Sequence, residues 1–254
     1  MKEKMYHNPN VDLYDIEFDL NNRWERLIDK AHKGKFDVKE FYSLCADTHQ
    51  FIAKYDKCYM IPKASLVLVE LLQEFYDDDW FLEERRDFFY SANYADCLTS
   101  LLIDGITEND STDNYDMDYE LCERWDWLFD DVCNDSLFDL KLFQDLAGDT
   151  FEYLKEYDKQ KMIPHATLKM YSLIRRYAMN SYGYLKGNKE AFVAREIAEA
   201  FESQMTRGLK YEIDDDLHPI FIVEGNGKYH IDALSFDLTE AVKNCPEWVT
   251  DEDD

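Results

Sequence analysis

Apolar residues recur at the spacing of an α-helix along most of this chain. Trp24, Leu27, Ile28 and Ala31 follow the i, i+3, i+4, i+7 pattern, and residues 41–52 repeat it. Glycine and proline are scarce, at 8 and 5 residues, whereas a β-sandwich with frequent turns would use more of both. The pattern therefore predicts a mainly α-helical protein.

Signals for helix starts and ends divide the first part of the chain into four helices. Asp37, followed three residues later by Glu40, has the pattern of a capping box, and Phe36 is placed to act as a hydrophobic staple. A third helix is expected to open at Pro62, since proline suits the first turn of a helix. A fourth helix is expected over about 82–103, ended by a glycine at 105.

The chain also resembles itself at an offset of about 100 residues. An Arg-Trp pair at 23–24 recurs at 124–125, and Met-Ile-Pro at 60–62 recurs at 162–164. Identities in the same order extend over about fifty residues and continue more weakly to the glycines at 105 and 208. The sequence therefore predicts a tandem duplication of a four-helix unit.

The pattern changes after the second copy. Two apolar segments, 218–223 and 228–233, flank the turn sequence Gly225-Asn226-Gly227, which predicts a small β-hairpin followed by a short helix. A two-stranded hairpin is only marginally stable alone, so we expect it to pack on the helices. The predicted organisation is an N-terminal arm (1–13), helical repeat 1 (14–106), a linker (107–114), helical repeat 2 (115–209), the hairpin and short helix (210–246), and an acidic tail (247–254).

Residues that match between the two repeats give two further predictions. Arg23 and Arg124 are each expected to pair with a carboxylate of their own repeat, such as Asp47 and Asp149. The matched apolar positions are expected to form the core: Trp24, Trp125, Leu27, Leu128, Phe41, Phe143, Leu66 and Leu168.

A search for chemistry finds no recognisable catalytic or metal-binding motif. The six histidines show no metal-ligand spacing, the acidic triplets at 77–79 and 214–216 lack the alternation of a calcium-binding loop, and no glycine-rich phosphate loop is present. The six cysteines form no CxxC pair and are expected to be free thiols. We predict no cofactor, no metal and no enzymatic activity.

Charge is the remaining feature. The chain has 28 basic and 55 acidic residues, for a net charge of −27, and residues 109–158 alone hold 16 acidic residues against 3 basic ones. Such a field repels nucleic acid and anionic lipid and speeds the encounter with basic partners. We expect a contiguous acidic face that binds a basic protein, with these candidate residues: Asp113, Asp116, Asp118, Glu120, Glu123, Asp126, Asp130 and Asp131.

Three classes of function stay open. An acidic inhibitor needs no catalytic residue, and the class includes an immunity protein covering a basic nuclease and an antagonist that mimics nucleic acid. A helical adaptor or regulatory scaffold would use the acidity mainly for solubility, and an uncharacterised enzyme is the second alternative. No apolar stretch reaches the roughly 18 residues of a membrane span and residues 1–6 lack the core of a signal peptide, so a cytoplasmic location is expected.

Overall fold

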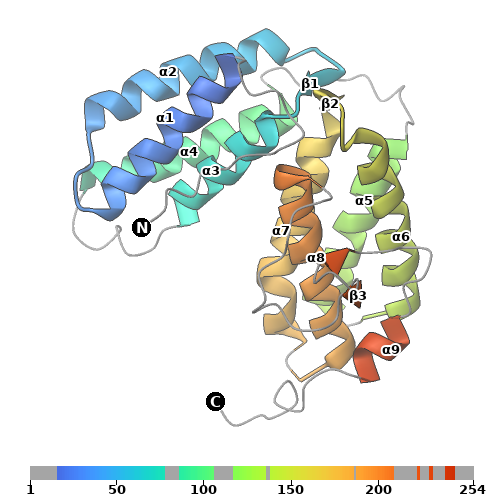
Figure 1. Cartoon of the computed structure of the whole chain (residues 1–254). Helices are drawn as coiled ribbons and strands as arrows, with labels where there is room; N and C mark the ends of the chain where they lie inside the picture. The colour runs from blue at the N-terminus through green and yellow to red at the C-terminus, as the bar shows by residue number, and fades with distance from the viewer. Residues whose placement is uncertain are drawn as a thin grey trace. The chain divides into compact units, whose positions relative to one another are not determined.

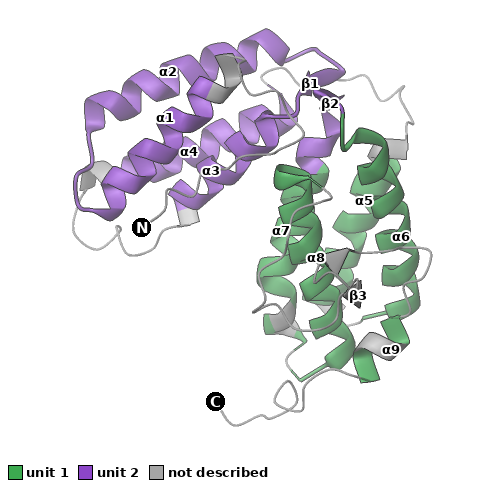
Figure 2. Ribbon diagram, viewed as in Figure 1, with its two compact units in different colours: residues 1–10, 115–159, 170–254 green, residues 11–114, 160–169 purple. Residues whose placement is uncertain are grey.

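The protein is mainly helical in a computed structural model (Figure 1). The structure describes residues 16–77, 86–105, 117–135, 138–185, 187–208, 222–223, 229–230 and 238–243. The chain divides into two compact units (Figure 2): unit 2 comprises 11–114 and 160–169, and unit 1 comprises 1–10, 115–159 and 170–254. The predicted arm, linker and acidic tail lie outside the described residues, so those boundaries stay predictions.

Unit 2 is built around four helices. They are α1 (Ile16–His32), α2 (Val38–Tyr55), α3 (Ser65–Asp77) and α4 (Arg86–Asp104). α1 packs against α2 and α3, and α4 packs against α2 and α3. The helices therefore enclose one core between them.

Trp24 lies at the centre of that core with its side chain fully buried. Its ring meets Phe41 and Phe75 edge-on, at 5.8 Å between centroids in each case, and its Nε1–H donates to Thr48 Oγ1 over 2.9 Å. Edge-to-face aromatic pairs add stability beyond the area they bury, and the hydrogen bond satisfies the buried indole N–H.

The predicted start of α2 is confirmed in two of its three parts. Asp37 caps the helix by accepting from the backbone N–H groups of Lys39 and Glu40, and the Phe36 ring contacts Phe41 at 5.8 Å. The Glu40 carboxylate accepts from Lys30 Nζ over 2.6 Å and does not return to the Asp37 N–H, so the capping box is not closed. At the far end of the unit, Gly105 ends α4 as predicted, with a φ of 88°.

The helix expected to open at Pro62 does not begin there. Met60–Pro62 is a short strand, β1, and α3 begins at Ser65. β1 pairs antiparallel with β2 (Met162–Pro164), and Ile61 lies opposite Ile163. Two bonds beyond the strands extend the ladder, from Lys63 N–H to Lys161 O over 2.9 Å and from His165 N–H to Tyr59 O over 2.7 Å. Pairing with a second extended segment outweighs the local preference for a proline-initiated helix.

Unit 1 holds the remaining helices. They are α5 (Met117–Asp130), a five-residue π-helix η2 (Asp131–Asp135), α6 (Leu140–Tyr157), α7 (Ala166–Tyr184) and α8 (Lys189–Arg207). β2 and the first turn of α7, within residues 160–169, belong to unit 2 by their contacts. The boundary between the units therefore does not follow the boundary between the predicted repeats.

The contacts around Trp24 recur around Trp125. The Trp125 ring meets Phe143 edge-on at 5.9 Å, and its Nε1–H donates to Thr150 Oγ1 over 3.0 Å. Asp139 caps α6 as Asp37 caps α2, and the Phe138 ring contacts Phe143 at 5.9 Å. All eight predicted core residues are confirmed as buried, each at most 2% exposed.

Both predicted ion pairs are also confirmed. Arg23 Nη1 lies 2.7 Å from Asp47 Oδ2, and Arg124 Nη1 lies 2.6 Å from Asp149 Oδ2. All four side chains are partly exposed, so the pairs contribute little stability and mainly fix side-chain positions.

Three short elements follow α8. β3 (Ile222–Val223) pairs antiparallel with β4 (Tyr229–His230), and the turn between them lies outside the described residues. α9 (Leu238–Lys243) packs on α8, and its Leu238 is fully buried. Among the described helices, none is long and apolar enough to cross a membrane.

Candidate protein-binding site

α5 separates an apolar side from an acidic side. The core positions Leu121, Trp125, Leu128 and Val132 are at most 2% exposed and recur at three- or four-residue intervals. This spacing places one side of the helix against the core, and the other side faces solvent.

Most of the predicted acidic residues lie on the solvent side of α5. Glu120, Asp130 and Asp131 are exposed, and Glu123 and Asp126 are half-buried. Asp118 belongs to α5 but the state of its side chain is not described, and Asp113 and Asp116 lie outside the described residues. The structure thus brings Glu120, Glu123, Asp126, Asp130 and Asp131 onto one helix and its π-helical continuation.

An exposed tryptophan lies in the middle of these carboxylates. Trp127 has 64% of its surface exposed, and Glu123 and Asp130 are four residues before it and three after it, on the same side of the helix. We call Glu120, Glu123, Trp127, Asp130 and Asp131 the α5 acidic face. The sequence prediction missed Trp127, although its position, two residues beyond the core Trp125, already placed it off the buried stripe.

The carboxylates of the α5 acidic face have no ion-pair partner among the described residues. The nearby Arg124 is directed to Asp149. Four carboxylates thus lie close together on one side of α5 and η2. These carboxylates therefore repel one another in the free protein.

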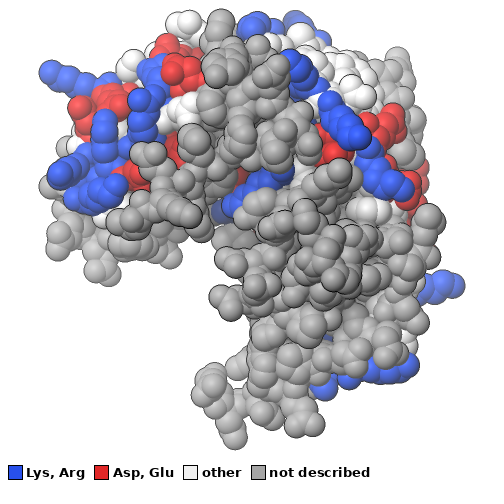
Figure 3. All heavy atoms as spheres, in the orientation of Figure 1, with Lys and Arg blue, Asp and Glu red and all other residues white. Residues whose placement is uncertain are grey.

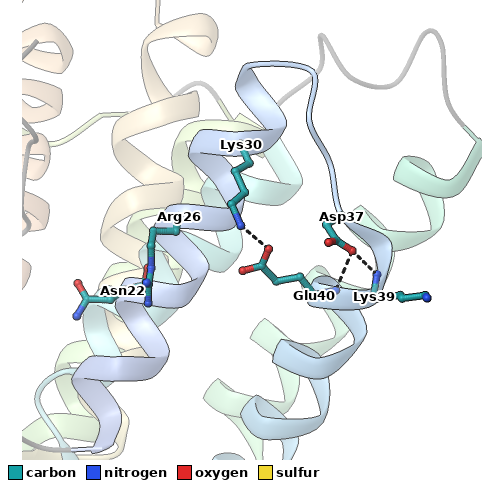
Figure 4. A network of polar contacts seen from close by, with 6 residues as sticks. All are labelled: Asn22, Arg26, Lys30, Asp37, Lys39 and Glu40. Atoms are coloured by element: carbon teal, nitrogen blue, oxygen red, sulfur yellow. Dashed lines mark hydrogen bonds and ion pairs between the residues drawn. The ribbon is translucent and has the colours of Figure 1, made fainter.

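The matching surface of α1 has a different charge balance. At the sequence offset that matches Arg23 with Arg124, the residues Asn22, Arg26, Asp29 and Lys30 correspond to Glu123, Trp127, Asp130 and Asp131. Lys30 pairs with Glu40, and Arg26 Nε–H donates to the backbone oxygen of Asn22 over 3.0 Å (Figure 4). On the face drawn in Figure 3, basic and acidic side chains are interspersed over α1 and α2.

A second group of charged residues lies on α8. Arg195 lies 2.6 Å from the buried Glu196, and Arg175 of α7 lies 2.5 Å from Glu202. Burial raises the pKa of Glu199 to about 7, with a further contribution from Glu196, while Arg195 opposes the rise. Glu199 can therefore exchange a proton near neutral pH, and of the arginine pairs near it, Arg175 with Glu202 joins α7 to α8.

The described residues give little support for other chemistry. They contain no group of three or more histidine, cysteine or acidic side chains that could hold a metal ion. Burial raises the pKa of the Cys45 thiol to about 12, which makes it a poor nucleophile. His165 Nε2 lies 2.7 Å from the Leu102 carbonyl oxygen, a contact that holds β2 against α4 within unit 2.

Comparisons with known proteins give no match. No family model matches the chain, and neither the curated proteins nor the solved structures include a significant match. The surfaces of the molecule are therefore the guide to its function.

Proposed function

We propose that this protein binds a basic protein partner through the α5 acidic face and acts without catalysing a reaction. The observation that carries the proposal is Trp127, exposed among carboxylates that have no cation partner in the described part of the chain. Tryptophan is enriched among residues that dominate binding energy, and surrounding carboxylates would steer a cationic surface towards it. A cationic partner would also relieve the repulsion within the face.

This function is that of an inhibitor or antagonist, and an immunity protein for a basic nuclease toxin is one form of it. An inhibitor needs only to bind its target and block it, so a face of binding residues is sufficient for this function. The alternative is a helical adaptor or regulatory scaffold, in which the acidity would mainly maintain solubility. A cytoplasmic location accords with both candidates.

We also infer that the two halves descend from one duplicated four-helix unit. The support is the recurrence of the same small set of contacts: the tryptophan to threonine hydrogen bond, the aspartate cap with its phenylalanine staple, and the arginine to aspartate pair. In this view the C-terminal hairpin and α9 are an addition to the second copy. A duplicated core would leave each copy free to acquire its own binding surface.

The first experiment identifies the partner. Proteins of the source organism are captured at low ionic strength on the immobilised full chain and, in parallel, on the Trp127→Ser variant. The expected partner is a basic protein retained by the wild type and lost, or strongly reduced, on the variant. Trp127 is exposed, so its replacement should leave the melting temperature nearly unchanged.

The second experiment measures association kinetics with that partner. Replacing Glu120, Asp130 and Asp131 with their amides should slow association, and the effect should shrink as salt screens the charges. The control variant removes three exposed carboxylates elsewhere and has the same net charge: Asp104→Asn, Asp145→Asn and Glu156→Gln. If both triple variants change the association rate equally, or neither does, the α5 acidic face is only a solubilising surface and the scaffold function replaces the inhibitor function.

A further inference from the structure

One ion pair joins α1 to α2 at the surface of unit 2, and its counterpart in unit 1 cannot form. Lys30 Nζ of α1 lies 2.6 Å from Glu40 Oε2 of α2 (Figure 4). At the sequence offsets that match the core tryptophans and the aspartate caps of the two repeats, the corresponding residues are Asp131 and Leu142. A carboxylate and an alkyl side chain cannot replace this pair.

The packing of α6 on α5 places Leu142 beside Asp131. The tryptophan to phenylalanine contact between the two helices measures 5.8 Å in unit 2 and 5.9 Å in unit 1, and the arginine to aspartate pair measures 2.7 Å and 2.6 Å. α6 therefore lies against α5 as α2 lies against α1. Leu142 also precedes Asp149 by two helical turns, and Arg124 holds Asp149 against α5, so Leu142 lies on the α5 side of α6.

Leu142 is exposed at this seam, close to the exposed tryptophan of α5. The exposed fractions of Leu142 and Trp127 are 51% and 64%, and Asp131, four residues after Trp127, lies between them. Two large apolar side chains exposed on neighbouring helices offer a contact area, whereas such residues scattered singly need no explanation. We call the α5 acidic face together with Leu142 the α5–α6 docking face.

Negative charge surrounds both apolar side chains. Residues 120–149 contain nine acidic residues and two basic ones, whereas the matching residues 19–47 contain six of each. One of the two basic residues, Arg124, is held in its ion pair with α6, and the other, Lys141, lies four residues before the exposed Asp145. The docking face therefore has an excess of carboxylates, and an occupant that complements it is cationic.

The length of the face indicates the shape of that occupant. Glu120 and Asp131 lie about three helical turns apart, which is roughly 16 Å along the helix axis. An amphipathic helix presents apolar residues in one stripe with lysine and arginine on both sides of it, and it can lie along the seam between two packed helices. An extended segment would turn every second side chain away from the face. A helix therefore complements the apolar residues and the carboxylates together.

We propose that the α5–α6 docking face binds a basic amphipathic helix of the partner protein. Apolar side chains of that helix contact Trp127 and Leu142, and its lysine and arginine side chains pair with the carboxylates on either side. The inference rests on the proposed function and specifies which part of the partner the site takes.

Two display libraries of basic peptides test the proposal. In the first, apolar residues at i, i+3, i+4 and i+7 form a stripe flanked by lysine and arginine, and the second has the same composition in shuffled order. Both are selected against the immobilised full chain at physiological ionic strength, where screening weakens binding by charge alone. Enriched peptides are titrated against the wild type, Leu142→Gln, Trp127→Ser and Met179→Gln. Met179, 57% exposed on α7, is the matched control for Leu142.

The proposal expects enrichment from the first library alone. Its enriched peptides should gain helical circular dichroism on binding, bind Leu142→Gln and Trp127→Ser at least about fivefold more weakly, and bind Met179→Gln as they bind the wild type. The proposal is overturned if no peptide of the first library is enriched, if the shuffled library is enriched equally, or if Leu142→Gln binds the peptides as well as the wild type does.

The natural partner separates failure of this inference from failure of the proposed function. A basic partner that is lost on Trp127→Ser but binds Leu142→Gln as tightly as the wild type supports the proposed function and overturns the docking of a helix on the seam. A partner that binds Trp127→Ser as tightly as the wild type overturns both.

Discussion

α1 and α5 each bury a tryptophan in the same set of contacts, but the sides they turn to solvent differ. In α1 the exposed charges have both signs and close short ion pairs, such as Lys30 with Glu40. In α5, apart from Arg124, which pairs with Asp149, the charges described on the solvent side are negative, have no described cation partner and surround Trp127. The buried side of the helix meets the same packing demand in both places, while the exposed side is free to differ.

α4 and α8 also have matching cores and different outer sides, but here the roles of the two units are exchanged. Unit 2 has the exposed aromatic residues, Tyr90 and Tyr94, and the matching positions of unit 1, Val193 and Ile197, are buried. Each unit thus has an exposed surface whose counterpart in the other unit is either neutralised by ion pairs or buried. Such differences point to function more directly than the shared core does, because core residues are constrained mainly by packing.

The largest expected effect tests whether the two cores are equivalent. Trp24→Ala and Trp125→Ala should each destabilise the protein by about 3 to 5 kcal/mol, because each leaves a large cavity and an unpaired threonine hydroxyl. Chemical denaturation with fluorescence detection gives the free energy of unfolding. Trp127→Ala is the exposed control, and a similar loss in that variant would contradict the assignment of Trp127 to the surface.

A smaller effect is expected at the helix caps. Asp37→Ala and Asp139→Ala should each cost about 1 kcal/mol, since both remove a side chain that accepts from two backbone N–H groups. The Asn variants should retain most of the stability. Unequal losses at the two positions would show that the matched contacts are not energetically equivalent.

Glu199 on α8 is expected to make stability depend on pH, whereas the matching residue on α4 is not. Because the folded pKa of Glu199 is raised to about 7, the folded state binds this proton more tightly than the unfolded state, and stability should fall as the pH rises from about 4.5 through 7. Glu199→Gln should remove this contribution, which is at most about 1 kcal/mol because the carboxylate is more than a third exposed. The exposed Asp96 holds the matching position on α4, and Asp96→Asn is the control. Denaturation curves at pH 5 and pH 8 give the free energy of unfolding at each pH. If the difference between the two values is the same in Glu199→Gln as in the wild type, Glu199 does not have the raised pKa.

The smallest effect concerns Asp130 on α5. Asp130→Asn should stabilise the protein by a few tenths of a kcal/mol, because it reduces the repulsion among the neighbouring carboxylates of the α5 acidic face. At the aligned position of α1, Asp29 lies 3.9 Å from Lys33, and Asp29→Asn should bring no gain. A loss of stability in Asp130→Asn would mean that the Asp130 carboxylate makes a stabilising contact in the free protein, which would contradict its assignment to the binding site.

The sequence by itself determined the helical class, the core and the helix caps. Helical spacing identifies Trp24 and Leu27 as buried because one side of each helix must face the core, and this inference needs no knowledge of neighbouring helices. Asp37 and Phe36 act on groups within five residues of themselves, so their roles follow from local geometry. The arginine to aspartate pairs could be predicted because both partners recur together in the two repeats.

The acidic site was predicted only in part. Charge density identified the carboxylates of residues 113–131, five of which the structure places along α5 and η2 with their side chains described. Trp127 was missed because charge density identifies only charged residues, although its position two residues after the buried Trp125 already placed it off the apolar stripe of α5.

Tertiary structure alone decided the features that depend on contacts between distant segments. Met60–Pro62 is a strand because Met162–Pro164, about 100 residues later, supplies the backbone partners that a three-residue segment cannot find locally. Val193 is buried and Tyr90 exposed, although both occupy the same place in their helices, because burial depends on the elements that pack around each helix. Local sequence specifies which backbone conformations and which helix sides are favoured, but burial and strand pairing also depend on groups that only the folded chain brings within reach.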